Sequence, residues 1–399
     1  MKRIGGFHFN HLMPSVSDGN FQDLHTYPVG DYPDSAISCD FNNDTHLDLP
    51  VANYDDHNVG VLLGNENGTF QAQIVYEAGN GPNSTISADF NNDNQLDLIV
   101  ANWFDKATSV LLGDGNGTFS TRQVYGAGNT PSDVIAADFN NDNILDLAVI
   151  NLYDNTISLL VREANGSVHS MIKYAAGINP RSIVATDLNG DNKTDLIVVN
   201  QGGNDIMLML DNDDGAFQGR LRCIIFQTPI SMALGDFNND NKSDLILTNV
   251  NNTVEILLNY SYGTFYTNGT FDTGRNPSAV ISDDFNNDMK MDLAVTNMYN
   301  KNASILLDCG NGTFQNQMAF PTGLRPISLT SGDFNNDKKR DLAVANNEGS
   351  NISVLFGNGD GTFQSQSMYE SGINSNSIIS VDLNNDRILN LISSGESGR

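Results

Sequence analysis

Short apolar runs alternate with polar, Asx-rich or glycine-rich stretches along most of the chain, and the pattern returns every 48 or 49 residues. In one unit the apolar runs at residues 70–76, 85–88, 98–102 and 109–112 have the length and composition of strands, and turn-forming residues separate them. No long apolar pattern with a helical period is present. We name these strands D, A, B and C in that order. Four short strands per unit predict an all-β chain of four-stranded antiparallel blades, the β-propeller class.

Between strands A and B of every unit lies a nine-residue loop with oxygen-bearing side chains at positions 1, 3, 5 and 9, and its clearest copy is Asp89-Phe90-Asn91-Asn92-Asp93-Asn94-Gln95-Leu96-Asp97. Clustered carboxylates repel each other unless a cation lies among them, and six to eight hard oxygen ligands suit Ca²⁺ better than Mg²⁺. The loop is not an EF-hand, because position 12 is Val100 within an apolar run. The alternative is a solvated Asx turn, which eight copies in register disfavour.

We therefore predict about seven or eight Ca²⁺ sites, with a backbone carbonyl at position 7 and water completing each ligand set. The eighth loop lacks its last carboxylate, since Asn390 stands at position 9. The predicted side-chain ligands are Asp40, Asn42, Asp44, Asp48, Asp89, Asn91, Asp93, Asp97, Asp138, Asn140, Asp142, Asp146, Asp187, Asn189, Asp191, Asp195, Asp236, Asn238, Asp240, Asp244, Asp284, Asn286, Asp288, Asp292, Asp333, Asn335, Asp337, Asp341, Asp382, Asn384 and Asp386.

The two ends of the chain carry incomplete units. Strand A and its loop occur eight times, strand C only seven times, and an unaccompanied strand D begins near Phe21. Propellers avoid an exposed edge by joining their ends, so residues 4–10 are expected to supply the missing strand C beside the last strands A and B. This closure favours eight blades over seven. Residues 1–19 match the repeat poorly and form a possible closing strand, and residues 20–399 form a single propeller.

The repeated features resemble those of a known family. The loop from Asp89 to Asp97, the Gly-x-x-Pro stretch from Gly79 to Pro82 and the turn ending in Gly117-Thr118-Phe119 are similar to FG-GAP/VCBS repeats, as found in the head propellers of integrin α-subunits. The resemblance covers about residues 20–390. It implies a β-propeller that holds Ca²⁺ in its A–B loops, but it does not specify a function, since one fold hosts many.

The formal net charge of −28 argues against nucleic acid and anionic membrane surfaces as partners. Each of the eight loops has three Asp at its ligand positions, except the last, where Asn390 replaces one. The loops therefore account for 23 of the 48 acidic residues. The negative charge is explained better by metal-binding loops than by a particular class of partner. No apolar segment is long enough to insert into a membrane, and we expect a monomer.

Because successive strands run in opposite directions, the A–B loops and C–D turns lie at one end of the blades, and the B–C and D–A loops lie at the other. The B–C and D–A loops vary between units and carry large side chains suited to recognition. The alternative is that these side chains pack between blades. The predicted ligand-binding residues are Tyr54, Trp103, Phe104, Tyr153, Arg181, Arg275, Tyr299 and Arg325.

Three functions remain open. The first is an extracellular or cell-surface recognition and adhesion module that binds a protein or a glycan through its B–C and D–A loops. The second is a lectin with a repeated sugar site, and the third is an enzyme resembling polysaccharide lyases. The units leave no room for inserted catalytic loops, and no acid–base or nucleophile pattern stands out, so we predict no catalytic residues. The extracellular setting follows from the loops, which would be mostly empty at cytosolic calcium.

Overall fold

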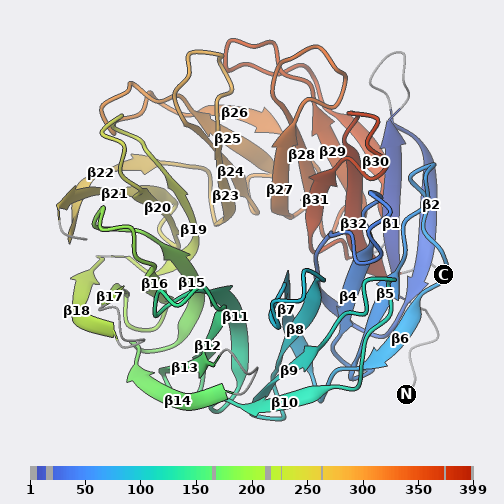
Figure 1. Cartoon of the computed structure of the whole chain (residues 1–399). Coiled ribbons are helices and arrows are strands. Elements are labelled where there is room, and N and C mark those ends of the chain that lie inside the picture. The colour runs from blue at the N-terminus through green and yellow to red at the C-terminus, as the bar shows by residue number, and fades with distance from the viewer. Residues whose placement is uncertain are drawn as a thin grey trace. The chain divides into compact units, whose positions relative to one another are not determined.

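The structure is a computed structural model that describes residues 7–14, 21–163, 168–211, 217–225, 227–261, 264–372 and 374–396. Throughout these ranges the chain forms strands and turns, and no helix is present (Figure 1). Eight antiparallel four-stranded sheets are the blades of an eight-bladed β-propeller, which confirms the predicted fold class and blade number. Residues 4–6 of the predicted closing strand lie outside the described ranges.

The chain divides into two compact units of four blades each. The central unit comprises residues 29–226. Each of its blades follows chain order from strand A to strand D. Its strands are β3 (Pro33–Ala36), β4 (Leu49–Asn53), β5 (Asn58–Leu62), β6 (Ile74–Glu77), β7 (Pro82–Ala88), β8 (Asp97–Asn102), β9 (Ala107–Leu111), β10 (Gln123–Gly126), β11 (Pro131–Ala137), β12 (Asp146–Asn151), β13 (Thr156–Arg162), β14 (Val168–Ala175), β15 (Pro180–Thr186), β16 (Asp195–Asn200), β17 (Asp205–Asp211) and β18 (Phe217–Ile224).

The terminal unit comprises residues 1–28 and 227–399. Three of its blades are continuous in sequence, and the fourth combines both ends of the chain. Its strands are β1 (Phe7–Pro14), β2 (Phe21–Val29), β19 (Pro229–Gly235), β20 (Asp244–Asn249), β21 (Thr253–Ser261), β22 (Thr264–Asp272), β23 (Pro277–Asp283), β24 (Asp292–Asn297), β25 (Asn302–Leu306), β26 (Met318–Pro321), β27 (Pro326–Gly332), β28 (Asp341–Asn346), β29 (Asn351–Leu355), β30 (Ser367–Glu370), β31 (Ile378–Val381) and β32 (Asn390–Glu396).

The composite blade has the strand order β2-β1-β32-β31 (Figure 1). Its strand C is β1, whose backbone pairs antiparallel with β32 in a register that runs from Phe7 opposite Glu396 to Leu12 opposite Leu391. The N-terminal segment thus supplies the strand that the repeat count lacks. Pairing the two ends of the chain in one sheet covers strand edges that would otherwise be open to other chains.

Each blade buries its strands to different depths. Strand B is buried on both faces, as in β8, which explains its continuous apolar run, whereas strand A is partly buried and strand D is largely exposed, as in β10. The structure starts four of the eight D strands, namely β6, β10, β26 and β30, four residues later than the sequence pattern suggests. Phe70, for example, pairs with Gly64 only in an isolated bridge, and regular pairing resumes at Ile74. The side chain of Phe70 is nevertheless buried.

Aromatic side chains join neighbouring blades. Phe119, which follows the Gly-Thr turn of one blade, packs edge-on against Phe41 and Tyr76 of the preceding blade, with ring centroids 5.0 and 5.2 Å apart. The same three-ring arrangement recurs around Phe217, Phe314, Phe363 and Phe21. The repeated phenylalanines of the sequence are therefore packing residues between blades, which hold the loops of successive blades at a fixed spacing.

Candidate ion-binding loops and recognition surface

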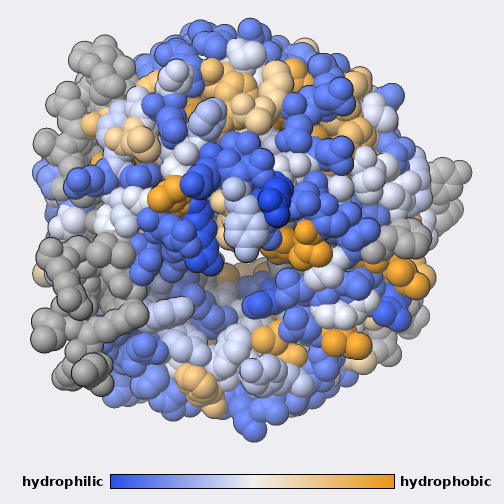
Figure 2. All heavy atoms as spheres, turned by 180° about the vertical axis from the view of Figure 1, so that it is seen from behind, coloured by the Kyte–Doolittle hydropathy of each residue, from blue (hydrophilic) through white to orange (hydrophobic). Residues whose placement is uncertain are grey.

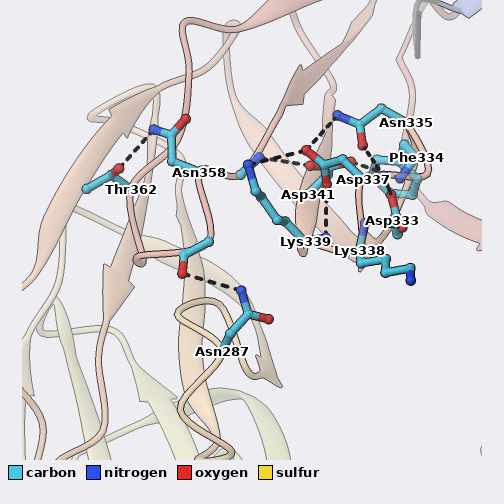
Figure 3. Close-up of polar contacts among 12 residues, drawn as sticks. Asn287, Asp333, Phe334, Asn335, Asp337, Lys338, Lys339, Asp341, Asn358 and Thr362 are labelled. Atoms are coloured by element: carbon cyan, nitrogen blue, oxygen red, sulfur yellow. Dashed lines mark hydrogen bonds and ion pairs between the residues drawn. The ribbon is translucent and has the colours of Figure 1, made fainter.

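The A–B loops fold back on their own backbone, as the seventh loop illustrates (Figure 3). The N–H of Asp337 donates to Asp333 Oδ1 and to Asn335 Oδ1, both at 3.0 Å, so the side chains of positions 1 and 3 converge on one point. The amide of Asn335 donates in turn to Asp337 Oδ2 at 3.3 Å. This arrangement places two carboxylates and one amide oxygen, from positions 1, 3 and 5, on one side of the loop.

The loop backbone adopts left-handed conformations at positions 4 and 6. In the second loop these residues are Asn92 and Asn94, with φ of 61° and 63°. Asparagine tolerates this region better than most residues, which accounts for the Asn-rich loops. In the sixth loop position 6 is Met289, with φ of 64° and a side chain that is 90% exposed. The turn geometry is therefore maintained even where the residue does not favour it.

The carboxylate at position 9 has a distinct structural role. Asp97 is fully buried, and its Oδ2 accepts the N–H of Phe90 at 2.8 Å while its Oδ1 accepts the N–H of Gly113 at 2.8 Å. It therefore ties the A–B loop to the C–D turn of the same blade. Equivalent pairs of bonds are made by Asp48, Asp146, Asp195, Asp244, Asp292 and Asp341.

Burial raises the pKa of these position-9 carboxyls, and the nearby loop carboxylates raise it further, while the two backbone donors oppose the shift. The pKa of Asp97 rises to about 6 and that of Asp341 to about 7. In the eighth loop Asn390 Oδ1 accepts the N–H of Leu383 at 3.2 Å. Position 9 can therefore be an asparagine, whose side-chain oxygen accepts a backbone N–H without placing a buried charge there.

The donor chemistry at positions 1, 3 and 5 fits a hard cation such as Ca²⁺. Lysine ammonium groups already lie near three position-5 carboxylates: Lys242 is 3.6 Å from Asp240, Lys290 is 3.2 Å from Asp288, and Lys339 is 3.6 Å from Asp337. In the described ranges, however, no three His, Cys, Asp or Glu side chains gather around one point. The third carboxylate of each of the first seven loops bonds to backbone N–H groups instead. Positions 1, 3 and 5 would hold the ion, and the ligand role of position 9 remains a prediction.

The predicted recognition residues are mostly exposed, but two pairs of them pack across neighbouring blades: Tyr54 against Phe104 and Trp103 against Tyr153, with ring centroids 5.6 and 6.2 Å apart. Tyr153 and Tyr299 are each 71% exposed and Phe104 is 59% exposed, whereas Tyr54 and Trp103 are half-buried. The remaining members, Arg181, Arg275 and Arg325, are also exposed. The face of the molecule shown in Figure 2 is predominantly hydrophilic, with hydrophobic side chains in small separate patches.

The structure brings three of the predicted residues of the central unit together. Tyr54, Trp103 and Arg181 line an open hollow of about 440 Å³. Five further residues that were not predicted from the sequence also line it, namely Tyr32, Asp34, Asp55, Asn83 and Ser132. The sequence contains a positional signal for three of them. The residue after the proline that begins strand A lines the hollow in four successive units, as Asp34, Asn83, Ser132 and Arg181. Of these four, only Arg181 was predicted.

A second hollow of about 410 Å³ lies nearby in the central unit and is lined by B–C and D–A loop residues that include Asp56, His57 and Asp105. Two of its three carboxylates accept backbone hydrogen bonds: Asp56 Oδ2 accepts the Asp31 N–H, and Asp105 Oδ2 accepts the Asn80 N–H, both at 2.9 Å. These bonds connect the B–C loop of a blade to its D–A loop. We therefore interpret this hollow as a structural feature of the loops.

Comparison with protein families gives a clear result. A profile described as an FG-GAP-like repeat matches residues 40–100, 89–149, 187–246, 236–295, 284–344 and 333–393. Each match begins at position 1 of a loop and ends within the strand that follows the next loop. The matches together cover more than half of the chain. A search of curated protein sequences finds no match.

Solved structures similar to this chain include a putative 6-phosphogluconolactonase from Bacteroides fragilis, which is 17% identical with a TM-score of 0.58 over 85% of this chain and 99% of the other. BBS1N, solved in complex with ARL6DN, is 13% identical with a TM-score of 0.55 over 84% and 96%. The periplasmic gluconolactonase PpgL of Pseudomonas aeruginosa is 12% identical with a TM-score of 0.52 over 80% and 97%. At these identities the similarity shows the fold alone.

Proposed function

Because the chain belongs to the FG-GAP-like repeat family, we propose that it is a recognition module that binds a protein or a glycan through its B–C and D–A loops. The A–B loops bind Ca²⁺ and stabilise the blades, and the module works outside the cell or at its surface, where millimolar calcium keeps such loops filled. The strongest support for the binding face is the hollow that Tyr54, Trp103 and Arg181 line at the variable end of the blades.

Several properties of this hollow favour recognition. Its volume is within the range of known ligand sites, and it combines aromatic walls with a few polar groups. Residues from four successive blades contribute, and they differ from blade to blade. A lectin with one sugar site per blade would require the same side chains in every repeat, so the variation favours a single composite site.

An enzyme is the alternative, since two structures of similar fold are named as gluconolactonases. The residues of the hollow include no histidine, cysteine or lysine, which leaves two carboxylates and two tyrosine hydroxyls as the candidate acid–base groups. Incubation with δ-gluconolactone and with 6-phosphogluconolactone tests this alternative. Hydrolysis that is lost in Asp34→Asn would replace the recognition proposal with an enzymatic one.

We expect the triple variant Trp103→Ala, Tyr153→Ala and Arg275→Ala to lose partner binding while its melting temperature changes by no more than a few degrees. Tyr153 and Arg275 are exposed and Trp103 is half-buried, so their truncation removes contact area with little loss of packing. Binding is measured on glycan and cell-surface-protein arrays in the presence of calcium.

The matched control replaces Val124, Met171 and Met368 with alanine, because these side chains are 52%, 44% and 60% exposed on D strands, away from the variable loops. The control should retain every interaction found for the parent protein. Equal binding by the two triple variants would refute the assignment of the binding face.

A further inference from the structure

Position 7 of the A–B loop separates the loops into two groups. In the first three loops, which belong to the central unit, this position has no lysine, whereas the fifth, sixth and seventh loops, which belong to the terminal unit, each have one. Position 7 is two residues from the position-5 carboxylate, so its charge bears on the proposed ligand set. The first group comprises His46, Gln95 and Ile144, and the second comprises Lys242, Lys290 and Lys339.

Each of these lysines contacts the position-5 carboxylate twice. The N–H of Lys339 donates to Asp337 Oδ1 at 2.9 Å, and its ammonium lies 3.6 Å from Oδ2 of the same side chain (Figure 3). In the sixth loop the Lys290 N–H donates to Asp288 Oδ1 at 3.0 Å, and the ammonium is 3.2 Å from Oδ2. The fifth loop repeats both contacts. A positive charge of the chain itself therefore lies beside a carboxylate that the proposed Ca²⁺ would use.

The stems of two of these lysines pack against the C–D turn of their own blade. A methyl group on Gly310 would lie 2.9 Å from Lys290 Cε, and one on Gly359 would lie 3.2 Å from Lys339 Cδ. Both glycines have positive φ, of 80° and 79°, which glycine adopts without strain. A side chain at either position would push the lysine stem away, so the turn glycines help to keep the ammonium groups at the loops.

The second loop has no such charge. Gln95 occupies the same place against Gly115, and its Oε1 accepts the Asn43 amide of the preceding loop at 2.7 Å. Oδ2 of Asp93 accepts the amide of Asn91 at 2.8 Å. In the described part of the chain, no lysine or arginine lies within ion-pair distance of the position-5 carboxylates of the first three loops. A cation that enters these loops displaces an amide rather than an ammonium group.

We infer that the position-7 lysines divide the calcium response of the protein between its two units. The first three loops fill at lower calcium and depend more on the ion, whereas the fifth to seventh loops fill at higher calcium and lose less stability without it. The affinity of a calcium loop follows the charge of its ligand set, and an ammonium group lowers that charge. The same ammonium relieves repulsion among the carboxylates of an empty loop.

This inference rests on the proposed binding of Ca²⁺ by the A–B loops, and it specifies how calcium regulates the proposed recognition face. The hollow lined by Tyr54, Trp103 and Arg181 belongs to the central unit. The composite blade that joins the two ends of the chain belongs to the terminal unit. Falling calcium should therefore loosen the blades that carry the hollow first, while the blade that closes the chain remains folded.

The expected difference in affinity is modest. The ammonium of Lys242 and the carboxylate of Asp240 belong to side chains that are 41% and 35% exposed, and exposed ion pairs shift an equilibrium by about 2- to 5-fold. Each lysine-bearing loop should therefore require about 2- to 5-fold more calcium for half-filling than the second and third loops. The fourth loop, the last of the central unit, also has a lysine at position 7, Lys193, and should follow the lysine-bearing group.

Hydrogen–deuterium exchange of the whole chain, followed by mass spectrometry over a series of buffered free calcium concentrations, measures the response of each blade. Amide exchange reports local opening, and the fully buried B strands provide one probe per blade. We expect exchange in chelator to rise more in β4, β8 and β12 than in β20, β24 and β28. With added calcium, β8 and β12 should become protected at about 2- to 5-fold lower concentrations than β24 and β28. Metal analysis of the same samples counts the bound ions.

Two lysines of the seventh loop provide a matched pair of variants. Lys339→Gln should lower the calcium midpoint of β28 by about 2- to 5-fold. Lys338→Gln removes the same charge one residue away, from a side chain that is exposed and forms no ion pair in the described part of the chain, and should change the midpoint by less than about half as much. Melting curves at saturating calcium establish that both variants are folded.

The reciprocal change places a lysine in the second loop. Gln95→Lys should raise the calcium midpoint of β8 and reduce the effect of chelator on its exchange. Because this change also removes the bond from the Asn43 amide, Gln95→Met serves as its control, which lacks the same bond but adds no charge. A shift that Gln95→Met reproduces in full would show that the lost bond, and not the added charge, is responsible, and would contradict the inference.

Equal calcium midpoints in all blades, or equal shifts in Lys338→Gln and Lys339→Gln, would overturn the inference and leave calcium binding by the loops intact. Fewer than four bound ions, with no response of exchange to chelator, would overturn calcium binding itself and the inference with it. Binding of a partner on the arrays is measured independently of both results. The failure of the inference and the failure of the proposed function are therefore distinguishable.

Discussion

The melting temperature of the protein should fall by tens of degrees when a chelator removes Ca²⁺. A ligand that binds only the folded state stabilises it by mass action, and at ~1 mM free Ca²⁺ with a dissociation constant of ~0.1 mM each site contributes about 1.4 kcal/mol. Seven independent sites would contribute about 10 kcal/mol, which is comparable with the whole stability of a typical domain. Without the ion, repulsion among the loop carboxylates adds to the loss.

Scanning calorimetry with calcium and with excess chelator measures this effect, and metal analysis of dialysed protein gives the number of sites. We expect about seven or eight ions, and the variant Asp93→Ala should lower the melting temperature by only a few degrees because it affects one loop of eight. Identical melting curves in the two conditions, or fewer than four ions bound, would show that the loops are plain turns. That result would also remove the argument for an extracellular setting.

Asp97→Ala should destabilise the protein by about 3 kcal/mol, more than Asp93→Ala in the same loop. The substitution leaves the buried N–H groups of Phe90 and Gly113 without their acceptor, and an unsatisfied buried donor costs about 1–3 kcal/mol. The carboxylate of Asp93 lies at the exposed side of the loop, where water replaces it. Urea denaturation of the two single variants measures the difference.

The same comparison in excess chelator separates the two possible roles of position 9. If Asp97 ties the loop to the C–D turn, its replacement remains costly without calcium, whereas an effect that disappears in chelator would identify it chiefly as a metal ligand. Asp97→Asn provides the conservative control. It should cost about half as much as alanine, because an amide keeps one acceptor oxygen, as Asn390 does in the eighth loop.

Much of the fold was predictable because each repeat encodes its own local structure. Strand B, the Asx-rich loop and the turn before the phenylalanine column recur in order, and each depends on residues within a few positions of one another. The number of blades also followed from the sequence, since an unpaired strand D at one end and strands A and B at the other complement each other. The two ends of the blades, and the exposed aromatics at the variable one, followed from strand parity.

The tertiary structure decided the features that depend on partners distant in sequence. The sequence from Phe7 to Pro14 lacks the repeat pattern, and its strand is defined by pairing with β32 at the far end of the chain. The bond from Gly113 to Asp97 joins a turn to a loop 16 residues away, so the spacing within the loop predicted a metal ligand at that position but could not reveal its bond to the turn. The hollow combines residues 34, 83, 132 and 181. They differ in type, and only the contact of successive A strands brings them together.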